Sequence, residues 1–197
     1  MARKRISKQL DEKQVVHIYT EGFTEEYYFK KLWHSGRIEK YSINKIKWSK
    51  LSGLKLMDKM GKSIKKMPKS DQPDIIIFVF DKDDLADKEI RSCVTEISSG
   101  IKIAFSNCSF ELWLLNHFER ITTHHDKNKL EKKLSQYLGA PYEKVQAKQK
   151  SQINRTFHTL DIALTHSQIY APIQNSDDWR KNPYTNVGEI VTFLQSK

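Results

Sequence analysis

Residues 74–84 read DIIIFVFDKDD, and this stretch limits the possible folds more than any other. Its six consecutive apolar residues are β-branched or aromatic, which is typical of a strand buried on both faces of a parallel sheet. Because side chains alternate along a strand, Asp81 and Asp83 are expected to point the same way from its carboxyl end. Ligands bind at that end of open α/β sheets.

Three carboxylates, those of Asp81, Asp83 and Asp84, lie within four positions at the end of this run. Like charges this close repel each other, and a cation or a shared proton relieves the repulsion. Hard oxygen ligands favour Mg²⁺ or Mn²⁺ over softer metals. A polar turn in which Asp84 caps the next helix explains the same residues, and this stretch alone does not decide between the two interpretations.

A second carboxylate site follows residues 15–20, whose β-branched content predicts a strand. Glu21 ends this strand and has no routine structural task there. Thr24 is expected to cap a helix that continues to about residue 34. Glu25 lies in the first turn of that helix, where compensation of the helix dipole alone accounts for an acid.

A third site follows a second apolar run, residues 101–105, which comes after a predicted helix over about residues 85–98. The next segment, residues 110–118, is strongly apolar and helical in pattern, and Glu111 is its only acid. Dipole compensation explains an acid near a helix start, and so does a ligand aimed into the same crevice as the other carboxylates. We favour the second explanation.

Strand and helix alternate four times along the first part of the chain, with an outer strand predicted at residues 41–48 and a helix at residues 53–67. This order predicts the α/β class, with a mainly parallel sheet covered by helices on both faces. The three carboxylate sites would then gather at one edge of the sheet. We expect a catalytic core over residues 14–119 and a helical C-terminal extension, residues 120–197, packed on it.

In the C-terminal part, Asp126 or Asn128 is expected to cap a helix, and residues 151–170 are expected to form another. The segment from Asn182 to Thr185 is expected to open the last helix, with Thr185 as its cap. His124 and His125 are adjacent, so they point to different faces of any regular element. We therefore expect a solvated loop there and no metal site.

The 197-residue chain has a formal net charge of +10, which suggests a polyanionic partner, most often a nucleic acid. Residues 41–70 carry nine lysines against one acid, so their repulsion is not offset locally. Two surfaces are predicted to bind phosphates, although solvated helix faces explain both of them as well. The first is the helical face formed by Lys55, Lys59, Lys62 and Lys66, and the second is the region of Lys144, Lys148, Lys150 and Arg155.

The two cysteines, Cys93 and Cys108, have neither CxxC spacing nor paired histidines, so we expect two free thiols in a reducing cytosol. No apolar segment is long enough to span a bilayer. The basic residues 1–5 are not followed by an apolar region, so no signal peptide is expected. A cytoplasmic protein without membrane contact is the resulting expectation.

Residues 20–25, TEGFTE, and residues 80–84, FDKDD, resemble the Toprim signature, a glutamate after the first strand and an Asp-x-Asp after a later one. Residues 106–115, SNCSFELWLL, and residues 182–187, NPYTNV, look more specifically like the RloB-like branch, so the resemblance covers nearly the whole chain. Members usually carry a proline where Cys108 stands. Because of this difference the conformation of the local turn is not predicted, whereas the assignment of the carboxylates is unaffected.

The resemblance implies a Mg²⁺-dependent nuclease-like fold associated with prokaryotic restriction and anti-phage defence loci. Cleavage of phosphodiester bonds is then expected, with RNA such as tRNA slightly preferred over DNA, and a partner ATPase or other protein from the same locus is a candidate partner. Glu21 would serve as general base or metal ligand, and Asp81 and Asp83 as ligands of Mg²⁺ or Mn²⁺. Asp84, Glu25 and Glu111 would hold a second ion or orient water. A non-enzymatic nucleic-acid-binding or sensor subunit is the alternative.

Overall fold

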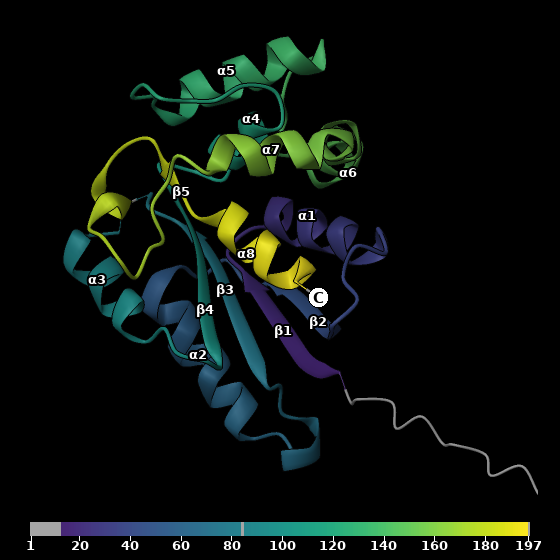
Figure 1. Ribbon diagram of the computed structural model, residues 1–197, viewed down its shortest axis with the longest axis vertical. Coiled ribbons are helices and arrows are strands. Elements are labelled where there is room, and N and C mark those ends of the chain that lie inside the picture. Colours follow the sequence, from purple (N-terminus) through teal and green to yellow (C-terminus); the bar gives the residue numbers. More distant parts are fainter. Residues whose placement is uncertain (1–12, 84, 197) are drawn as a thin grey trace, which may run out of the picture.

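In the computed structural model, which describes residues 13–83 and 85–196, five strands form one sheet in the order β2-β1-β3-β4-β5. They are β1 (Gln14–Thr20), β2 (Tyr41–Trp48), β3 (Ile75–Asp81), β4 (Ile101–Asn107) and β5 (Tyr184–Thr185). The first four run parallel to their neighbours, and β5 runs antiparallel to β4. The predicted α/β class, the mainly parallel sheet and the outer position of β2 are therefore confirmed (Figure 1).

The central strand β3 is buried on both faces, as its continuous apolar run predicted. Ile77 and Val79 face a core shared with α1 (Phe23–His34) and α8 (Val187–Gln195). Phe78 and Phe80 face a second core, shared with α2 (Gly53–Lys65) and α3 (Asp87–Thr95). Figure 1 shows these two helix pairs on opposite sides of the sheet.

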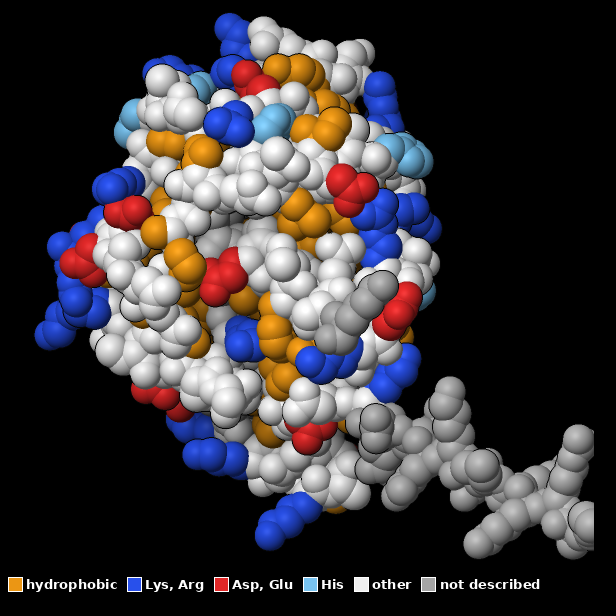
Figure 2. Space-filling model, viewed as in Figure 1, with side chains coloured by type: hydrophobic (Ala, Val, Ile, Leu, Met, Phe, Trp, Pro, Cys, Tyr) orange, Lys and Arg blue, Asp and Glu red, His pale blue; other side chains and the backbone are white. Residues whose placement is uncertain are grey.

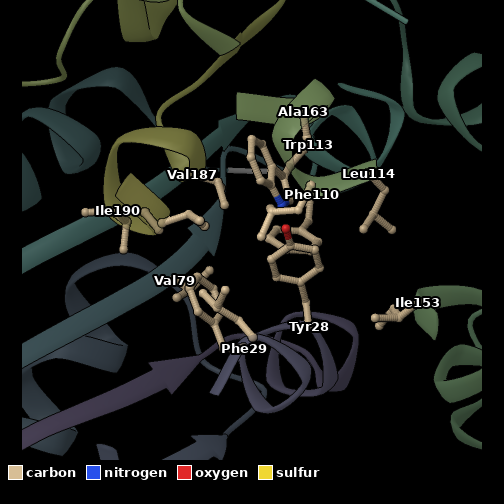
Figure 3. Close-up of a cluster of buried hydrophobic side chains, with 14 of the residues drawn as sticks. Tyr28, Phe29, Val79, Phe110, Trp113, Leu114, Ile153, Ala163, Val187 and Ile190 are labelled. Carbon is tan, nitrogen blue, oxygen red and sulfur yellow. The ribbon is translucent and has the colours of Figure 1, made fainter. Parts of the chain in front are cut away.

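A further helical group lies beyond α1, on the side away from the sheet (Figure 1). It contains α4 (Glu111–Asn116), α5 (Lys127–Leu138), α6 (Gln146–Thr156) and α7 (Leu160–Ser167). Its centre is Trp113, which is fully buried near the rings of Tyr28 and Phe110 (Figure 3). The ring of Tyr28 makes edge contacts with both, at centroid distances of 5.6 Å to Phe110 and 5.9 Å to Trp113. The helical group thus shares one core with the sheet.

The C-terminal segment returns to the sheet, and the expectation that Asn182–Thr185 opens a helix is wrong. Tyr184 and Thr185 pair with Asn107 and Ser106 of β4. The reason lies in Asn186, whose side chain accepts from the Phe105 amide at 2.7 Å and donates to the Ile103 carbonyl at 2.8 Å. Residues 184–195 of the expected helical extension therefore supply a strand and a helix of the sheet layer.

Two helix starts also differ from the prediction. Gly22, not Thr24, precedes α1, and Thr24 is buried inside it without a capping hydrogen bond. The helix expected over residues 151–170 begins five residues earlier, at Gln146, and a 3-10 turn at Phe157–Thr159 divides it into α6 and α7. The expected cap of α5 is confirmed, because the Asp126 carboxylate accepts from the Lys129 amide at 2.8 Å.

None of the helices in the described part of the chain is both long and apolar enough to cross a membrane. Cys93 and Cys108 are free thiols, as expected. His125 lies in a loop, where its Nδ1 contacts the Thr123 carbonyl at 2.6 Å.

Candidate active site

Strands β1 and β3 bring Glu21 and Asp81 together at the carboxyl edge of the sheet. The strands pair in parallel up to Thr20 and Val79, and the Glu21 amide continues the ladder by donating to the Val79 carbonyl at 2.9 Å. The Asp81 amide in turn donates to Oε2 of Glu21 at 3.2 Å. Each of the two strands thus delivers one carboxylate to the same edge, as the sequence predicted.

Glu25, in the first turn of α1, is buried at the same edge. Its carboxylate lies against Gly22, where a Cβ atom would come within 2.6 Å of Oε2. Any larger residue at position 22 would therefore push the carboxylate out of its place. Oε2 of Glu25 is buried and has no hydrogen-bond partner.

Glu111, the first residue of α4, is only 2% exposed. Its Oε1 accepts from the Tyr142 hydroxyl at 2.9 Å and from the Lys144 ammonium at 2.8 Å. Lys144 also pairs with Glu131 at 3.1 Å. The other oxygen of Glu111, Oε2, is buried without a partner.

The carboxylates of Glu21, Glu25, Asp81 and Glu111 influence one another electrostatically, and we call them the acid cluster. Burial raises the pKa of Asp81 well above its usual value, and the charges of Glu25, Glu111 and Glu21 raise it further. Burial also raises the pKa of Glu25 to about 7, with added repulsion from Glu111 and Glu21. Burial acts the same way on Glu111 and is the largest single influence, but the charge of Lys144 together with the hydrogen bonds that Glu111 accepts outweighs it, so the pKa of Glu111 is lowered.

Asp83 does not join the acid cluster, although alternation along β3 had predicted that it would point with Asp81. Its backbone has a φ of 29°, in the left-handed region, which breaks the alternation directly after the strand. The Asp83 carboxylate is exposed and pairs with Lys127 at 3.0 Å. Asp84 lies outside the described residues.

The acid cluster matches a divalent cation in its chemistry but does not form a ready coordination site. Carboxylate oxygens are the donors that Mg²⁺ and Mn²⁺ prefer, and the buried oxygens without partners on Glu25 and Glu111 are available to an ion. In the described residues, however, no three acidic, histidine or cysteine side chains are close enough together to hold a metal. The expected convergence of Glu21, Asp81 and Asp83 is therefore wrong for this structure. Without an ion, repulsion between the like charges keeps the carboxylates apart, so they would have to move closer together to coordinate one.

The family model described as RloB-like protein matches residues 16–194. The chain belongs to the RloB-like family. Comparison with curated proteins and with solved structures found no match. The matched range includes the whole acid cluster and the segment from Asn182 to Val187, so the resemblance seen in the sequence is confirmed.

The two predicted phosphate-binding surfaces of this RloB-like chain differ in how free their cations are. The side chains of Lys55 and Lys59 on α2 and of Lys66 directly after it are exposed, and Lys62 is paired with Asp58 at 2.7 Å. In the second region the Lys144 side chain is partly exposed, but its ammonium is paired with Glu111 and Glu131. Lys148 lies 4.0 Å from Glu143. Lys150 and Arg155 are exposed, without an ion pair among the described residues.

Tyr142 and Lys144 are the site residues whose role the sequence did not indicate. They lie in the segment between α5 and α6, more than thirty positions from Glu111. Lys144 has the same surroundings in the sequence as the exposed lysines near it, so nothing there marks it as the partner of a buried acid. The tertiary packing of α5 against α4 brings this segment over Glu111.

Proposed function

We propose that this RloB-like protein cleaves phosphodiester bonds in nucleic acid with the help of a divalent cation. The observation that carries the proposal is the acid cluster, which gathers four carboxylates at the carboxyl edge of the sheet, buries three of them and leaves oxygens of Glu25 and Glu111 unpartnered. A structural role does not require such an arrangement, because it costs stability unless a ligand compensates the charge.

Glu21, Asp81, Glu25 and Glu111 are the residues that would hold the ion, which supplies charge stabilisation at the phosphoryl oxygens and activates water. Without an ion, burial and the neighbouring acids hold the pKa of Glu25 at about 7, so a bound cation would favour loss of its proton near neutral pH. Tyr142 and Lys144 fix Oε1 of Glu111 and so determine where Oε2 is presented. Asp84 remains a predicted ligand, whereas Asp83 pairs with Lys127 outside the acid cluster and is not assigned to the ion.

Cleavage of labelled total RNA and of labelled DNA in Mg²⁺, Mn²⁺ or EDTA tests the proposal. Asp81→Ala should lower the cleavage rate by at least about 100-fold, because a metal ion supplies several kcal/mol of transition-state stabilisation. Asp83→Asn is the informative companion, since it removes one charge from the same strand end but leaves the acid cluster intact. Cleavage that persists in EDTA, or full activity of Asp81→Ala, would contradict the proposal.

A non-enzymatic nucleic-acid-binding or sensor subunit is the second candidate. The ion pair between Lys144 and Glu111 favours it, because it partly neutralises the acid cluster without a metal. Affinity for nucleic acid, measured beside cleavage, separates the two candidates. An enzyme loses activity in Asp81→Ala and keeps its affinity, whereas a binding subunit shows no cleavage to lose.

The lysine face of α2 is proposed to contribute sequence-independent phosphate contacts. Replacing Lys55, Lys59, Lys62 and Lys66 with glutamine should weaken binding and make the salt dependence shallower by roughly 0.7–0.9 per lost contact. The measurement is a titration of labelled nucleic acid at several salt concentrations. An unchanged affinity and slope would mean that this face is only solvated and that the basic region containing Lys150 and Arg155 is the better candidate.

A further inference from the structure

Two hollows adjoin on α6, on the other face of the sheet from the lysine face of α2. One has a volume of about 350 Å³, lies between α1 and α6, and is lined by Tyr27, Lys30, Lys31, His34, Lys150, Ile153 and Asn154. The other has a volume of about 580 Å³ and is lined by Ala147, Lys150, Ser151, Asn154, Arg155 and His158. Because they share Lys150 and Asn154, they lie next to each other, and we call the surface that they form together the α1–α6 groove.

The α1–α6 groove is cationic, and no acid is among its lining residues in the described chain. Lys150 and Arg155 make no ion pair with any described residue, and the Lys31 ammonium lies over the Phe157 ring at 6.0 Å. Only Lys30 is engaged, by Glu26 at 3.0 Å. Figure 2 shows Lys, Arg and His side chains gathered at the right-hand edge of the molecule, over α6 and the end of α1. These cations are therefore available to an anionic ligand.

The two helices that form the walls of the groove both start close in the chain to residues at the acid cluster. Glu25 lies in the first turn of α1, and the groove residue Tyr27 follows it by two positions. Lys144, which contacts Glu111, lies two positions before the start of α6. From Tyr27 to His34 the groove follows α1 for about 10 Å, at 1.5 Å per residue. A strand bound in the groove would thus lie along two elements that also carry or adjoin residues of the acid cluster.

We propose that a single-stranded segment of the nucleic acid lies in the α1–α6 groove, with its phosphates on Lys31, Lys150 and Arg155. This inference rests on the proposed function, because it assumes that the strand in the groove extends from a cleavage site at the acid cluster. Tyr27 and the imidazoles of His34 and His158 supply ring faces for the bases. Cations combined with aromatic rings along a groove are the arrangement by which proteins bind single strands, whose bases, unlike those of a duplex, are free to stack.

The test measures the affinity for labelled single-stranded RNA, single-stranded DNA and a duplex of the same sequence, in EDTA so that cleavage does not interfere. Lys150→Gln combined with Arg155→Gln should weaken single-strand binding and reduce the salt slope by about 1.4, or about 0.7 per lost contact. A matched control, Lys88→Gln with Lys132→Gln, removes the same charge from exposed positions outside the groove and should leave both quantities near wild type.

Tyr27→Leu separates stacking from charge. It should weaken single-strand binding about fivefold or more and leave the salt slope unchanged, because a stacking contact releases no counterions. The inference is overturned if wild type does not bind single strands, if the groove variants bind like the control, or if the duplex loses as much affinity as the single strand. Equally tight binding of polyglutamate would point to an acidic protein partner and would also overturn it.

These outcomes are distinct from failure of the proposed function. Groove-dependent binding without any cleavage would refute the nuclease and retain the groove. Metal-dependent cleavage with unchanged binding by the groove variants would retain the nuclease and refute the groove.

Discussion

Ionisable side chains are buried in two regions of this molecule, and their surroundings differ. In the acid cluster, like charges face one another and two carboxylate oxygens have no partner. At His117, within the core centred on Trp113, the side chain is fully buried but both ring nitrogens are engaged. Nε2 lies 3.1 Å from the Tyr28 hydroxyl and Nδ1 lies 3.4 Å from Oγ1 of Thr159.

The two regions show that buried ionisable side chains can serve either structure or function. His117 is neutral, because burial lowers its pKa to about 4, and a neutral ring with two partners suits an apolar core. In the acid cluster the pKa values of Asp81 and Glu25 are raised, and one oxygen each of Glu25 and Glu111 has no partner. Such an uncompensated energetic cost is typical of sites that bind a ligand. The following predictions test that division, from the largest expected effect to the smallest.

The pH dependence of stability should have opposite signs in the two regions. The pKa of Glu25 is about 7 in the folded protein against 4.5 in the unfolded chain, so its contribution is complete below pH 4.5 and is lost as the pH rises through 7. The pKa of His117 is about 4 against 6.5, so its contribution is complete above pH 6.5 and is lost as the pH falls through 4. Each amounts to about 3 kcal/mol over its range.

Urea unfolding in EDTA at a series of pH values measures these slopes. Between pH 4.5 and 6.5, Glu25→Gln should make the free energy of unfolding rise more steeply with pH than in wild type. His117→Gln should make it fall with pH instead. If both substitutions changed the slope in the same direction, the two regions would not differ in the way proposed here.

Binding of a divalent cation should stabilise the acid cluster and leave the His117 region unaffected. At a hundredfold excess over its dissociation constant, Mg²⁺ or Mn²⁺ should add about 2.7 kcal/mol to the free energy of unfolding of wild type. Asp81→Asn should largely abolish this gain. In EDTA the same variant should be at least as stable as wild type, because one repelling charge is gone.

Thermal melts with EDTA and then with metal provide the measurement. Asp83→Asn is the matched control for these melts. Because the Asp83 carboxylate pairs with Lys127, this variant should keep the stabilisation by metal. If Asp81→Asn melted well below wild type in EDTA and metal stabilised neither protein, the carboxylates would be structural and no metal site would exist.

The sequence predicted the part of this architecture that depends on local pattern. Local patterns, namely two apolar runs, one β-branched run and one imperfectly alternating segment, predicted four strands. The rule that parallel strands share a carboxyl edge brought Glu21, Asp81 and Glu111 together. The sequence did not predict that the Asp83 side chain points away from Asp81, because a single residue with positive φ interrupts the alternation of side chains. The short strand β5 was also missed, since its pairing depends on side-chain bonds of Asn186 to a strand about eighty residues away.

The residues that contact the carboxylates of the acid cluster could be predicted only in part, because those contacts depend on tertiary packing. A strand end fixes where a carboxylate lies, but its charge balance depends on whichever segment packs above it. Here that segment is residues 139–145, and its two contacts with Glu111 are made by side chains that a surface loop could equally carry. Tyr142 and Lys144 are partners of Glu111 because the folded chain buries Glu111 beneath them. That burial cannot be read from the local sequence.

The smallest expected effect comes from removing one hydroxyl in each region. Tyr142→Phe deletes the donor to Glu111, and Tyr28→Phe deletes the contact to His117. Each should lower the free energy of unfolding by about 1 kcal/mol, the usual net value of a buried hydrogen bond. Only Tyr142→Phe should also change the stabilisation by Mg²⁺, because Oε1 of Glu111 loses one of the two groups that hold it.

Urea unfolding of both variants, with EDTA and with Mg²⁺, distinguishes the two roles. Tyr28→Phe serves as the control for Tyr142→Phe, since both lose one buried hydroxyl and keep the aromatic ring. An equal change in the metal response of the two variants would mean that it follows general stability. If neither variant changed the response, the Tyr142 contact would be structural, and the acid cluster would begin to resemble the His117 region with which it is contrasted.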